Sequence, residues 1–392
     1  MLVKKLLTVI AILLAAGLLY RAYQYYYPAL TYLYPRLPAP SQANQGQVKP
    51  LTVPPGFSLA HYASGLSDPR DLEFDPAGIL LVSEPSQGRI VALPDKIVVV
   101  SGLNRPHGLA FARGRLYVAE TNAVAIYDYD PTTHSASNRK KIIDLPSGGG
   151  HWTRSLLVKD NQLYISIGSS CNVCRESNPR RAAVYVANLD GTNFRPFASG
   201  LRNSVFMAAH PQTGAIWTTD MGRDNLGDNL PPDEINILET GKSYGWPVCY
   251  GQNMLDRTFE KNEPPLELPQ GMTMCEAAYH TTASYIDLPA HSAPLGLAFI
   301  PNSWPTEYRG DLLVAYHGSW NRSTPTGYKI VIADPQTKLI QDFITGFIPS
   351  GAQSGSEALG RPVDLIFDQQ GRLYISDDKS GSVYLVTPPP AG

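Results

Sequence analysis

The chain has 392 residues, of which 17% are charged, and a formal net charge of −2. A nearly neutral chain has no strong positive electrostatic potential to attract phosphate backbones, which excludes nucleic acid as a main partner. With 43% hydrophobic residues there is material for a large core, and 33 glycines and 34 prolines favour many short strands over long helices.

The first 27 residues have the features of a signal anchor or signal peptide. Lys4 and Lys5 precede an uncharged, mostly apolar run over residues 6–20, and Arg21 ends it. As a helix the run would rise about 22 Å, short of a hydrocarbon core of about 30 Å. Because Arg21 can snorkel and the tyrosines at 25–27 resemble an interfacial aromatic belt, we expect a hydrophobic helix that stays as a membrane anchor.

The alternative is cleavage at the small residues 15–17, as in a secretory signal peptide. In either case the body is expected to be exported. It would lie on the periplasmic side of a bacterial inner membrane, or be soluble in the periplasm if the signal is cleaved. The proline-dotted, polar segment 28–55 is expected to be a semi-rigid tether to the folded part, residues 56–388.

A repeated unit follows the tether: a short apolar strand, a turn that mostly contains glycine, and a second β-prone strand. The copies are residues 71–74 with 78–82, 108–111 with 114–118, 155–158 with 162–165, 204–207 with 214–217, 296–299 with 310–314, and 364–367 with 371–375. Six copies in phase are typical of a propeller, in which each copy supplies the inner strands of one blade. The sequence therefore predicts an all-β, six-bladed β-propeller of four-stranded blades.

The repeat also predicts where chemistry is placed. Residues just before each first strand share one phase, so they should gather at one end of the central channel. These residues are Arg70, His107, His151 with Arg154, Arg202 with Asn203, His291 with Ser292, and Arg361. Such a polar, cationic ring would suit an anionic cofactor or ligand. For Arg70 or His107 taken alone, capping of a strand end is an equally good interpretation.

Four cysteines fall into two couples, Cys171 with Cys174 and Cys249 with Cys275. A covalently attached c-type haem would need histidine directly after the second cysteine of the C-x-x-C pair, and Arg175 stands there instead. The four could ligate zinc, but the couples are unevenly spaced and an exported protein meets an oxidising environment. We therefore expect two disulfides, each within one couple.

Several motifs, in this order, resemble the soluble glucose and aldose sugar dehydrogenases that depend on pyrroloquinoline quinone (PQQ). They are Gly-His-x-x-Arg at 150–154, Gly-Leu-Arg-Asn at 200–203, the acidic loop from Met221-Gly222 to Asp-Glu-Ile-Asn at 233–236, and Ser-Tyr-Gly-Trp-Pro at 243–247. The block His-Gly-Ser-Trp-Asn-Arg at 317–322 and the Cys171–Cys174 insert resemble the sorbosone-dehydrogenase-like branch more closely.

The resemblance implies an exported quinoprotein oxidoreductase that oxidises a sugar or sugar-derived aldehyde or hemiacetal by hydride transfer to PQQ. It assigns His151 the role of general base, which suits an imidazole that titrates near neutrality. Arg202, Asn203 and Arg361 match the family's cofactor contacts. The family's second arginine near Arg361 is Val363 here, and Asn321 or Arg322 is expected in place of its cofactor lysine.

Calcium is the second expected cofactor. In the family one ion bridges the quinone to two backbone carbonyls, which correspond here to Gly222 and Arg223, and the carboxylate of Asp224 would suit the same hard cation. The alternative is that Asp224, Asp228 and Asp233 are solvated loop acids. Electrons would pass to a separate acceptor, a cytochrome or a quinone, since the chain carries no haem motif.

Two other functions stay open at the level of sequence. One is a non-catalytic propeller that binds a partner or glycan, which the replacement of the second arginine by Val363 would favour. The other is a calcium-dependent propeller lactonase, which would need several carboxylates around a metal at the channel centre. The predicted ring of Arg, His and Asn side chains disfavours the lactonase.

Overall fold

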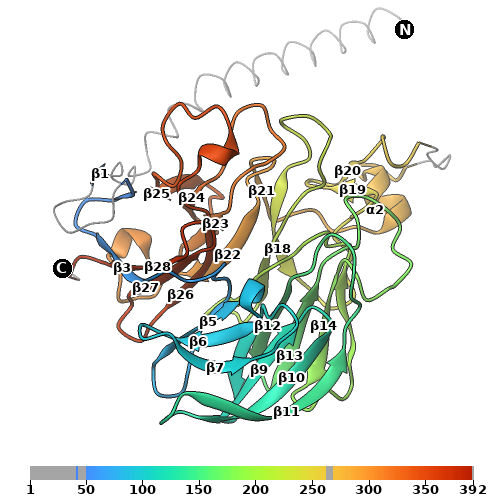
Figure 1. Cartoon of the computed structure of the whole chain (residues 1–392). Helices are drawn as coiled ribbons and strands as arrows, with labels where there is room; N and C mark the ends of the chain where they lie inside the picture. Colours follow the sequence, from blue (N-terminus) through green and yellow to red (C-terminus); the bar gives the residue numbers. More distant parts are fainter. Residues whose placement is uncertain (1–40, 43–49, 262–267, 391–392) are drawn as a thin grey trace, which may run out of the picture. The chain divides into compact units, whose positions relative to one another are not determined.

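The computed structural model describes residues 41–42, 50–261 and 268–390 (Figure 1). The predicted N-terminal helix and most of the predicted tether lie outside these residues. Within the described part, no helix has the length and apolar character needed to cross a membrane. Close to the end of the predicted tether, Leu51 and Val53 are buried, and the backbone of Thr52 bonds to that of Thr345.

Six four-stranded antiparallel sheets make up the described body, as the six repeats predict. The first blade holds β4 (Leu72–Phe74), β5 (Leu80–Glu84), β6 (Arg89–Ala92) and β7 (Ile97–Ser101). The second holds β8 (Leu109–Ala112), β9 (Arg115–Glu120), β10 (Ala123–Asp130) and β11 (Ser135–Asp144). The third holds β12 (Arg154–Lys159), β13 (Gln162–Ile167), β14 (Ala183–Asn188) and β15 (Arg195–Ser199).

The remaining blades include strands brought from a distance. The fourth holds β16 (Met207–Ala209), β17 (Ile216–Asp220), β18 (Asp233–Leu238) and β21 (Ile286–Leu288). The fifth holds β22 (Pro294–Phe299), β23 (Leu312–Tyr316), β24 (Lys329–Ala333) and β25 (Ile340–Ile344). The sixth holds β26 (Pro362–Phe367), β27 (Leu373–Asp377), β28 (Ser382–Thr387) and, from the other end of the chain, β3 (Ser58–Ser64).

Every predicted pair of inner strands is present. The fourth copy begins later than its pattern predicts, at Met207 instead of Ser204. The reason is that Ser204 uses its polar groups elsewhere: its carbonyl accepts from the Ser166 hydroxyl, and its own hydroxyl bonds to Thr218. These bonds tie the segment before β16 to neighbouring strands without extending the ladder.

The blades form a closed ring. The innermost strand of each sheet contacts that of the next, from β4 through β8, β12, β16, β22 and β26 and back to β4. Buried apolar clusters lie between neighbouring blades, for example Ile126 and Leu163 between the second and third. The last blade is completed by β3, which pairs with β28 from Ser58 to Ser64. The ends of the propeller are therefore joined by hydrogen bonds within one sheet.

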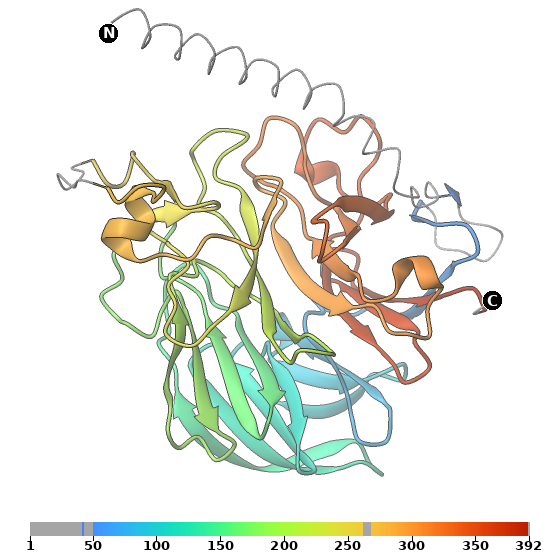
Figure 2. The ribbon, with the colours of Figure 1, turned by 180° about the vertical axis from the view of Figure 1, so that it is seen from behind.

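A long excursion separates β18 from β21. It contains β19 (Cys249–Tyr250), β20 (Met254–Leu255) and α2 (Met274–Tyr279), the gold helix of Figure 2. Thr273 and Glu276 begin α2 with a reciprocal capping box. The disulfide Cys249–Cys275 ties the helix to β19, as predicted. Shorter elements elsewhere are β1 (Ser41–Gln42) with β2 (Thr52–Val53), and the 3-10 turns η1 (Pro85–Gln87), η2 (Thr306–Tyr308) and η3 (Gly355–Glu357).

Antiparallel pairing decides which loops share an end of the ring. The first strand of each blade begins at the end where the second strand finishes. Loops before first strands and loops after second strands therefore meet at one end of the channel, and the hairpin turns lie at the other.

Candidate functional site

A cavity of about 420 Å³ lies among the loops at this shared end. Its wall is formed by His151, Trp152, Arg202, Asn203, Met221, Gly222, Asp224, Asp233, His291, Ala293, His317, Gly318, Ser319, Trp320 and Arg361. The predicted base and the predicted cofactor contacts Arg202, Asn203 and Arg361 are thus brought together. Trp320 is 74% exposed and forms part of the rim.

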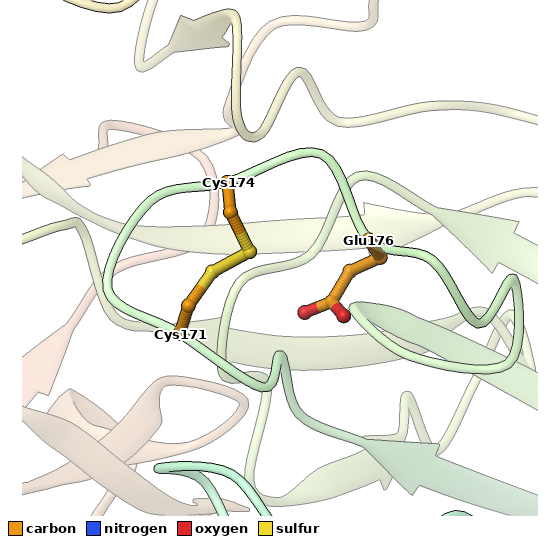
Figure 3. Close-up of side chains that lie close together, drawn as sticks. All are labelled: Cys171, Cys174 and Glu176. Carbon is orange, nitrogen blue, oxygen red and sulfur yellow. A yellow bond between two sulfur atoms is a disulfide. The ribbon is translucent and has the colours of Figure 1, made fainter.

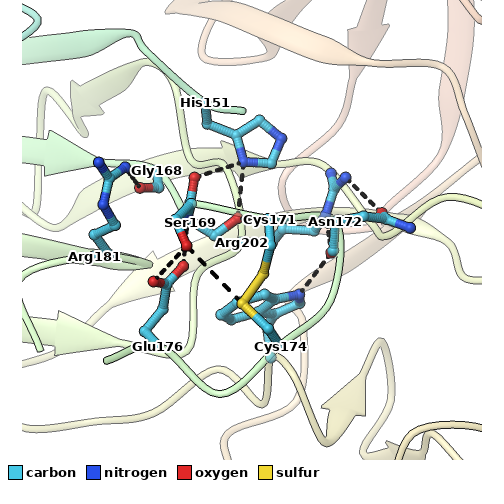
Figure 4. Close-up of a disulfide and its surroundings, with 11 residues drawn as sticks. His151, Gly168, Ser169, Cys171, Asn172, Cys174, Glu176, Arg181 and Arg202 are labelled. Carbon is cyan, nitrogen blue, oxygen red and sulfur yellow. Dashed lines mark hydrogen bonds between the residues drawn. A yellow bond between two sulfur atoms is a disulfide. The ribbon is translucent and has the colours of Figure 1, made fainter. Parts of the chain in front are cut away.

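His151 precedes β12, and its hydrogen bonds define its tautomer. The Ser169 hydroxyl donates its single proton to the Cys171 carbonyl at 2.7 Å, so it acts as an acceptor toward His151 Nδ1 at 2.8 Å. The Ser169 carbonyl lies 3.1 Å from the same nitrogen (Figure 4). Nδ1 therefore carries the proton, and Nε2 keeps a lone pair. Burial and then the nearby Arg202 lower the pKa of His151 to about 3, below the near-neutral value expected from the sequence, so the ring is neutral near pH 7 and a weaker base than a free imidazole.

Arg202 is buried and its guanidinium is held by three residues. Its Nε donates to the Asn172 carbonyl and its Nη2 to Asn172 Oδ1, both at 2.8 Å. Nη2 also donates to Asp224 Oδ2 at 3.0 Å. The contact of Nη1 with the Met221 carbonyl is longer, at 3.4 Å. One N–H of Nη1 therefore keeps no protein acceptor in the part of the chain that the structure describes.

Asn203 is fixed through its backbone. Both it and Arg202 donate their amide N–H groups to the two carboxylate oxygens of Asp220, at 2.7 and 2.9 Å. The Asn203 side chain has less support, since among the described residues its Nδ2 contacts only the Met221 sulfur, at 3.5 Å. Its buried Oδ1 has no hydrogen-bond partner in the same part of the chain. An orphaned amide oxygen in a cavity wall is a group that a ligand can satisfy.

Of the predicted calcium residues, Gly222 and Asp224 line the cavity and Arg223 does not. Gly222 lies in the wall, and its N–H donates to Asp233 Oδ1 at 2.8 Å. A Cβ there would approach the Pro232 carbonyl to 2.7 Å, so the position accepts only glycine without movement. The Arg223 side chain turns away to pair with Asp256 at 2.7 Å. Asp224 is in the wall with one carboxylate oxygen on Arg202, while Nδ1 of His291 lies 4.0 Å from the other.

Asp233 belongs to the same wall. Its second oxygen accepts from the Ser292 hydroxyl and the Ala293 amide, at 3.0 and 2.9 Å. Burial raises the pKa of Asp233 to about 6 in spite of these donors. The third predicted loop acid, Asp228, is not a wall residue and bonds to Ser323.

Arg361 and His317 form the opposite part of the site. The Arg361 guanidinium donates to the carbonyls of His317 and Gly318, at 3.0 and 2.6 Å. His317 Nε2 lies 2.9 Å from Asp378, which also accepts from Arg70 at 2.6 Å. Although burial alone would raise it, the pKa of Asp378 lies well below its usual range, because His317 and Arg70 both favour the carboxylate.

Other predicted residues do not reach the cavity. Arg154 lies beneath His151, with its guanidinium on the carbonyls of residues 146, 151 and 153. His107 is fully buried against the Ser155 hydroxyl. Asn321 and Arg322, expected in place of a cofactor lysine, are not part of the wall, and Arg322 bonds to the Ala290 carbonyl and to Asn229. Arg70 is not a wall residue, but it pairs with Asp378 and its guanidinium lies 6.0 Å from the ring centre of the wall residue Trp152.

Sequence reasoning missed several wall residues and one supporting residue. Met221, His317 and Trp320 follow second strands, which end where first strands begin, so the antiparallel rule could have found them. Trp152 follows His151 directly. Asn172 was not foreseen, because nothing in its sequence position indicates a contact with Arg202, which lies 30 residues further on.

The disulfide Cys171–Cys174 forms as predicted. In the described ranges, Cys171, Cys174 and Glu176 are the one group in which three metal-ligating atoms lie close together (Figure 3). The two sulfurs are bonded to each other, so neither is a thiolate ligand. Glu176 accepts instead from the amide and hydroxyl of Ser170. This trio is therefore a structural loop support.

Larger hollows of about 660 and 730 Å³ lie at the hairpin end of the ring. Carboxylates that line these hollows accept hydrogen bonds from backbone amides of the adjacent turns. Asp334 accepts from the amides of Gln336 and Thr337, and Asp368 from those of Gln370 and Arg372. These carboxylates stabilise tight turns, so size alone does not make the hollows the better candidates.

Comparison with known proteins shows extensive similarity. The sequence model of the TrAA12-like family matches residues 51–389. A PQQ-dependent pyranose dehydrogenase of Coprinopsis cinerea is 27% identical over 86% of this chain, which spans about half, 54%, of that relative. A PQQ-dependent sugar dehydrogenase of Hypocrea jecorina is 26% identical over 84% of this chain and 88% of its own length.

The fold is also similar to solved structures. The holo form of the pyranose dehydrogenase PQQ domain from Coprinopsis cinerea superimposes with a TM-score of 0.72. The match covers 87% of this chain and 98% of that domain, at 24% identity. This likeness supports the propeller fold over its whole length.

Proposed function

This chain belongs to the TrAA12-like family, and from that premise we propose that it is a PQQ-dependent dehydrogenase of a sugar or sugar-derived aldehyde. One observation carries the proposal. The cavity brings together a neutral imidazole with a lone pair at Nε2 and two arginines suited to an anionic cofactor. The narrower assignment to a sorbosone-dehydrogenase-like branch stays a prediction based on the 317–322 block.

The wall fits a flat, polycarboxylate quinone. Arg202 and Arg361 offer guanidinium groups, Asn203 an orphaned amide oxygen, and Trp152 and Trp320 apolar ring surfaces. Asp224 and Asp233 in the same wall would repel an anion. A divalent cation bound between them and the cofactor would offset that repulsion, which supports the proposed calcium and its oxygen ligands near Gly222 and Asp224.

When bound, PQQ accepts the hydride from the sugar carbon and later releases its electrons to a separate acceptor. The residues of the chain would supply the proton acceptor and would orient the cofactor. His151 Nε2 would accept the proton of the sugar hydroxyl as the carbon–hydrogen bond breaks. Ser169 keeps Nδ1 as the donor and thereby leaves Nε2 as the basic atom. The arginines would hold charge that develops on the cofactor.

The decisive test is cofactor binding by the full-length apoprotein. Titration with PQQ and calcium, followed by absorbance and calorimetry, should show saturable binding that weakens when calcium is omitted. Arg361→Ala should weaken it by at least about tenfold, as expected for loss of a charged contact. Arg322→Ala is the matched control, since this arginine is off the cavity wall.

Binding should be followed by dye-linked oxidation of a panel of pyranoses and aldehydes. If the wild-type protein shows no saturable PQQ binding at tens of micromolar, the dehydrogenase proposal is wrong, and a non-catalytic binding propeller becomes the better interpretation. If Arg322→Ala weakens binding as much as Arg361→Ala does, the proposed cofactor position in this cavity is wrong.

We also propose export, with the N-terminal segment as anchor or cleaved signal. The two disulfides support an oxidising compartment. Expressed in a Gram-negative host, the full chain should fractionate with the inner membrane, or with the periplasm if cleaved. Recovery of the protein in the cytosol with four free thiols would contradict this proposal.

A further inference from the structure

The loop that follows β13 contacts both chemically important sides of the cavity. It contains Ser169, which bonds to His151, and Asn172, which bonds to Arg202 (Figure 4). We propose that the disulfide-closed loop 171–174 is a positioning element, which holds the proposed base in one tautomer and the proposed cofactor arginine in one orientation. This inference rests on the proposed function and names residues beyond the direct contacts of that site.

Asn172 makes an unusually complete set of bonds. Its backbone carbonyl accepts from Arg202 Nε at 2.8 Å and from Trp246 Nε1 at 3.3 Å. Its side-chain oxygen accepts from Arg202 Nη2 and from the Asp224 amide, both at 2.8 Å. Its Nδ2 donates to the Asp224 carbonyl at 3.2 Å. One residue thus engages two nitrogens of the guanidinium and fixes the backbone of the acid that pairs with it.

These bonds fix the direction in which the Arg202 guanidinium points. Asn172 and Asp224 satisfy the Nε and Nη2 donors, so Nη1 is the nitrogen left to bind a ligand. A guanidinium has a rigid, planar fork, so fixing one edge also fixes the direction of the other. Without Asn172 the same side chain could turn toward Asp224 alone.

The link to His151 passes through Cys171. The Cys171 carbonyl accepts the Ser169 hydroxyl proton at 2.7 Å, and this bond makes the hydroxyl oxygen an acceptor for His151 Nδ1–H. If that carbonyl moved, the hydroxyl could rotate and donate to Nδ1, and only the Ser169 carbonyl, 3.1 Å away, would then favour the proton on Nδ1. Part of the population would carry the ring proton on Nε2 instead. In that part, Nε2 would lose the lone pair that the proposed reaction needs.

The disulfide gives this loop a rigidity that packing does not supply. Residues 170–174 are only half-buried. Covalent closure between Cys171 and Cys174 restricts the conformations open to the two residues between them. The Glu176 carboxylate holds the preceding Ser170. The covalent bond therefore takes the place of the apolar contacts that would otherwise fix such a loop.

The first test uses the apoprotein and needs no activity. Full-length protein labelled with 15N-histidine, with the His151 signals assigned by comparison with His151→Gln, should show a protonated Nδ1 and an unprotonated Nε2 at pH 7. The Cys171→Ser/Cys174→Ser double variant should show a mixture of tautomers. Val173→Ala, within the same loop, should resemble wild type. A protonated Nε2 in wild type, or an unchanged tautomer in a folded double variant, would overturn the role assigned to Cys171.

The second test addresses Arg202. Asn172→Ala should raise the PQQ dissociation constant by about tenfold or more, the scale expected for lost hydrogen bonds to a charged group. Val173→Ala should leave it unchanged, and thermal unfolding checks that both variants are folded. Equal affinity of Asn172→Ala and wild type would refute the positioning role of Asn172. If wild type binds no PQQ, the proposed function fails, whereas the tautomer measurement still decides the His151 part of the inference.

Discussion

At the scale of single residues, the three histidines of the cavity wall differ in their hydrogen-bond partners. Among the described residues His151 has no carboxylate partner, and burial together with the nearby Arg202 keeps the ring neutral. His317 is paired with Asp378, yet its pKa is lowered to about 4 because burial outweighs that partner. Nε2 of His317 is engaged by Asp378 and Nε2 of His291 by the Gly227 carbonyl, whereas His151 bonds through Nδ1 and keeps the lone pair of Nε2. Among the described residues of the wall, His151 is therefore the ring placed to accept a proton at Nε2.

The first prediction concerns His151. Replacement by glutamine should lower turnover with any active sugar by about 10²- to 10⁴-fold, the range attributed to a general base. PQQ affinity should change little, because Nε2 faces the reacting group in the proposal and Arg202 and Arg361 hold the cofactor. Steady-state kinetics with an artificial acceptor, together with cofactor titration, measure both quantities. Turnover within tenfold of wild type would exclude His151 as the base.

At the scale of elements, the loops at the cavity are held by residues of other elements, either in the same blade or in the neighbouring one. The segment before β16 is anchored by Asp220 at the end of β17, and Arg361 before β26 donates to carbonyls that follow β23. Ring closure adds to this, since β3 completes the last blade and β26 of that blade contacts β4 of the first. Site geometry therefore depends on strands that contribute no side chain to the cavity.

The second prediction tests ring closure. Leu59 in β3 is 2% exposed, and its truncation in Leu59→Ala should cost about 2–5 kcal/mol of unfolding free energy. Ser58→Ala, at the exposed neighbouring position of the same strand, should change stability by less than about 0.5 kcal/mol. Chemical denaturation monitored by tryptophan fluorescence compares them. Equal stability of the two variants would mean that β3 does not close the ring.

At the scale of the whole molecule, the interior contains many carboxyl groups with shifted pKa values. Burial raises the pKa of Asp220 to about 7 and, helped by Asp220, that of Glu234 to about 8. It raises the pKa of Asp364 to about 7 and, helped by Asp364, that of Glu73, a half-buried residue beside the hollow of about 730 Å³, to about 8. These groups remain largely protonated in the folded protein at pH values where the unfolded chain is ionised.

The third prediction follows from this difference in proton binding. Between about pH 4 and pH 8 the folded protein binds more protons at these carboxyls than the unfolded chain, so they make stability fall as pH rises. The neutral histidines act oppositely, but only below their unfolded pKa of 6.5. The melting temperature of the metal-free apoprotein should therefore fall from pH 6.5 to pH 8.

The control for the pH experiment is Glu73→Gln, which removes one shifted carboxyl at a distance from the cavity wall. The variant should show a smaller fall in melting temperature over the same range. Differential scanning calorimetry in the presence of a chelator keeps calcium from adding its own pH dependence. A melting temperature that does not fall toward pH 8 would show that the shifted carboxyls ionise in the folded protein without cost.

The sequence alone determined the features that depend on local pattern or on spacing. Alternating apolar strands and turns repeat six times, and because each copy needs a neighbour to bury its faces, six copies imply a propeller. The same phase placed His151, Arg202, Asn203 and Arg361 at one end. The two cysteine couples also paired as their spacing and the predicted export suggested.

Only the tertiary structure decided contacts between residues that no periodicity relates. Arg154 and His107 share the phase of His151, yet neighbouring blades cover them, and Arg322 turns to Asn229 instead of the cavity. Asn172 supports Arg202 because the loop after β13 lies against the loop before β16. Likewise β3 closes the sixth blade because the ring brings the two ends of the propeller together. Such contacts form between residues far apart in the sequence and depend on how whole blades pack against one another. No local sequence pattern relates the two partners, so the sequence alone could not predict them.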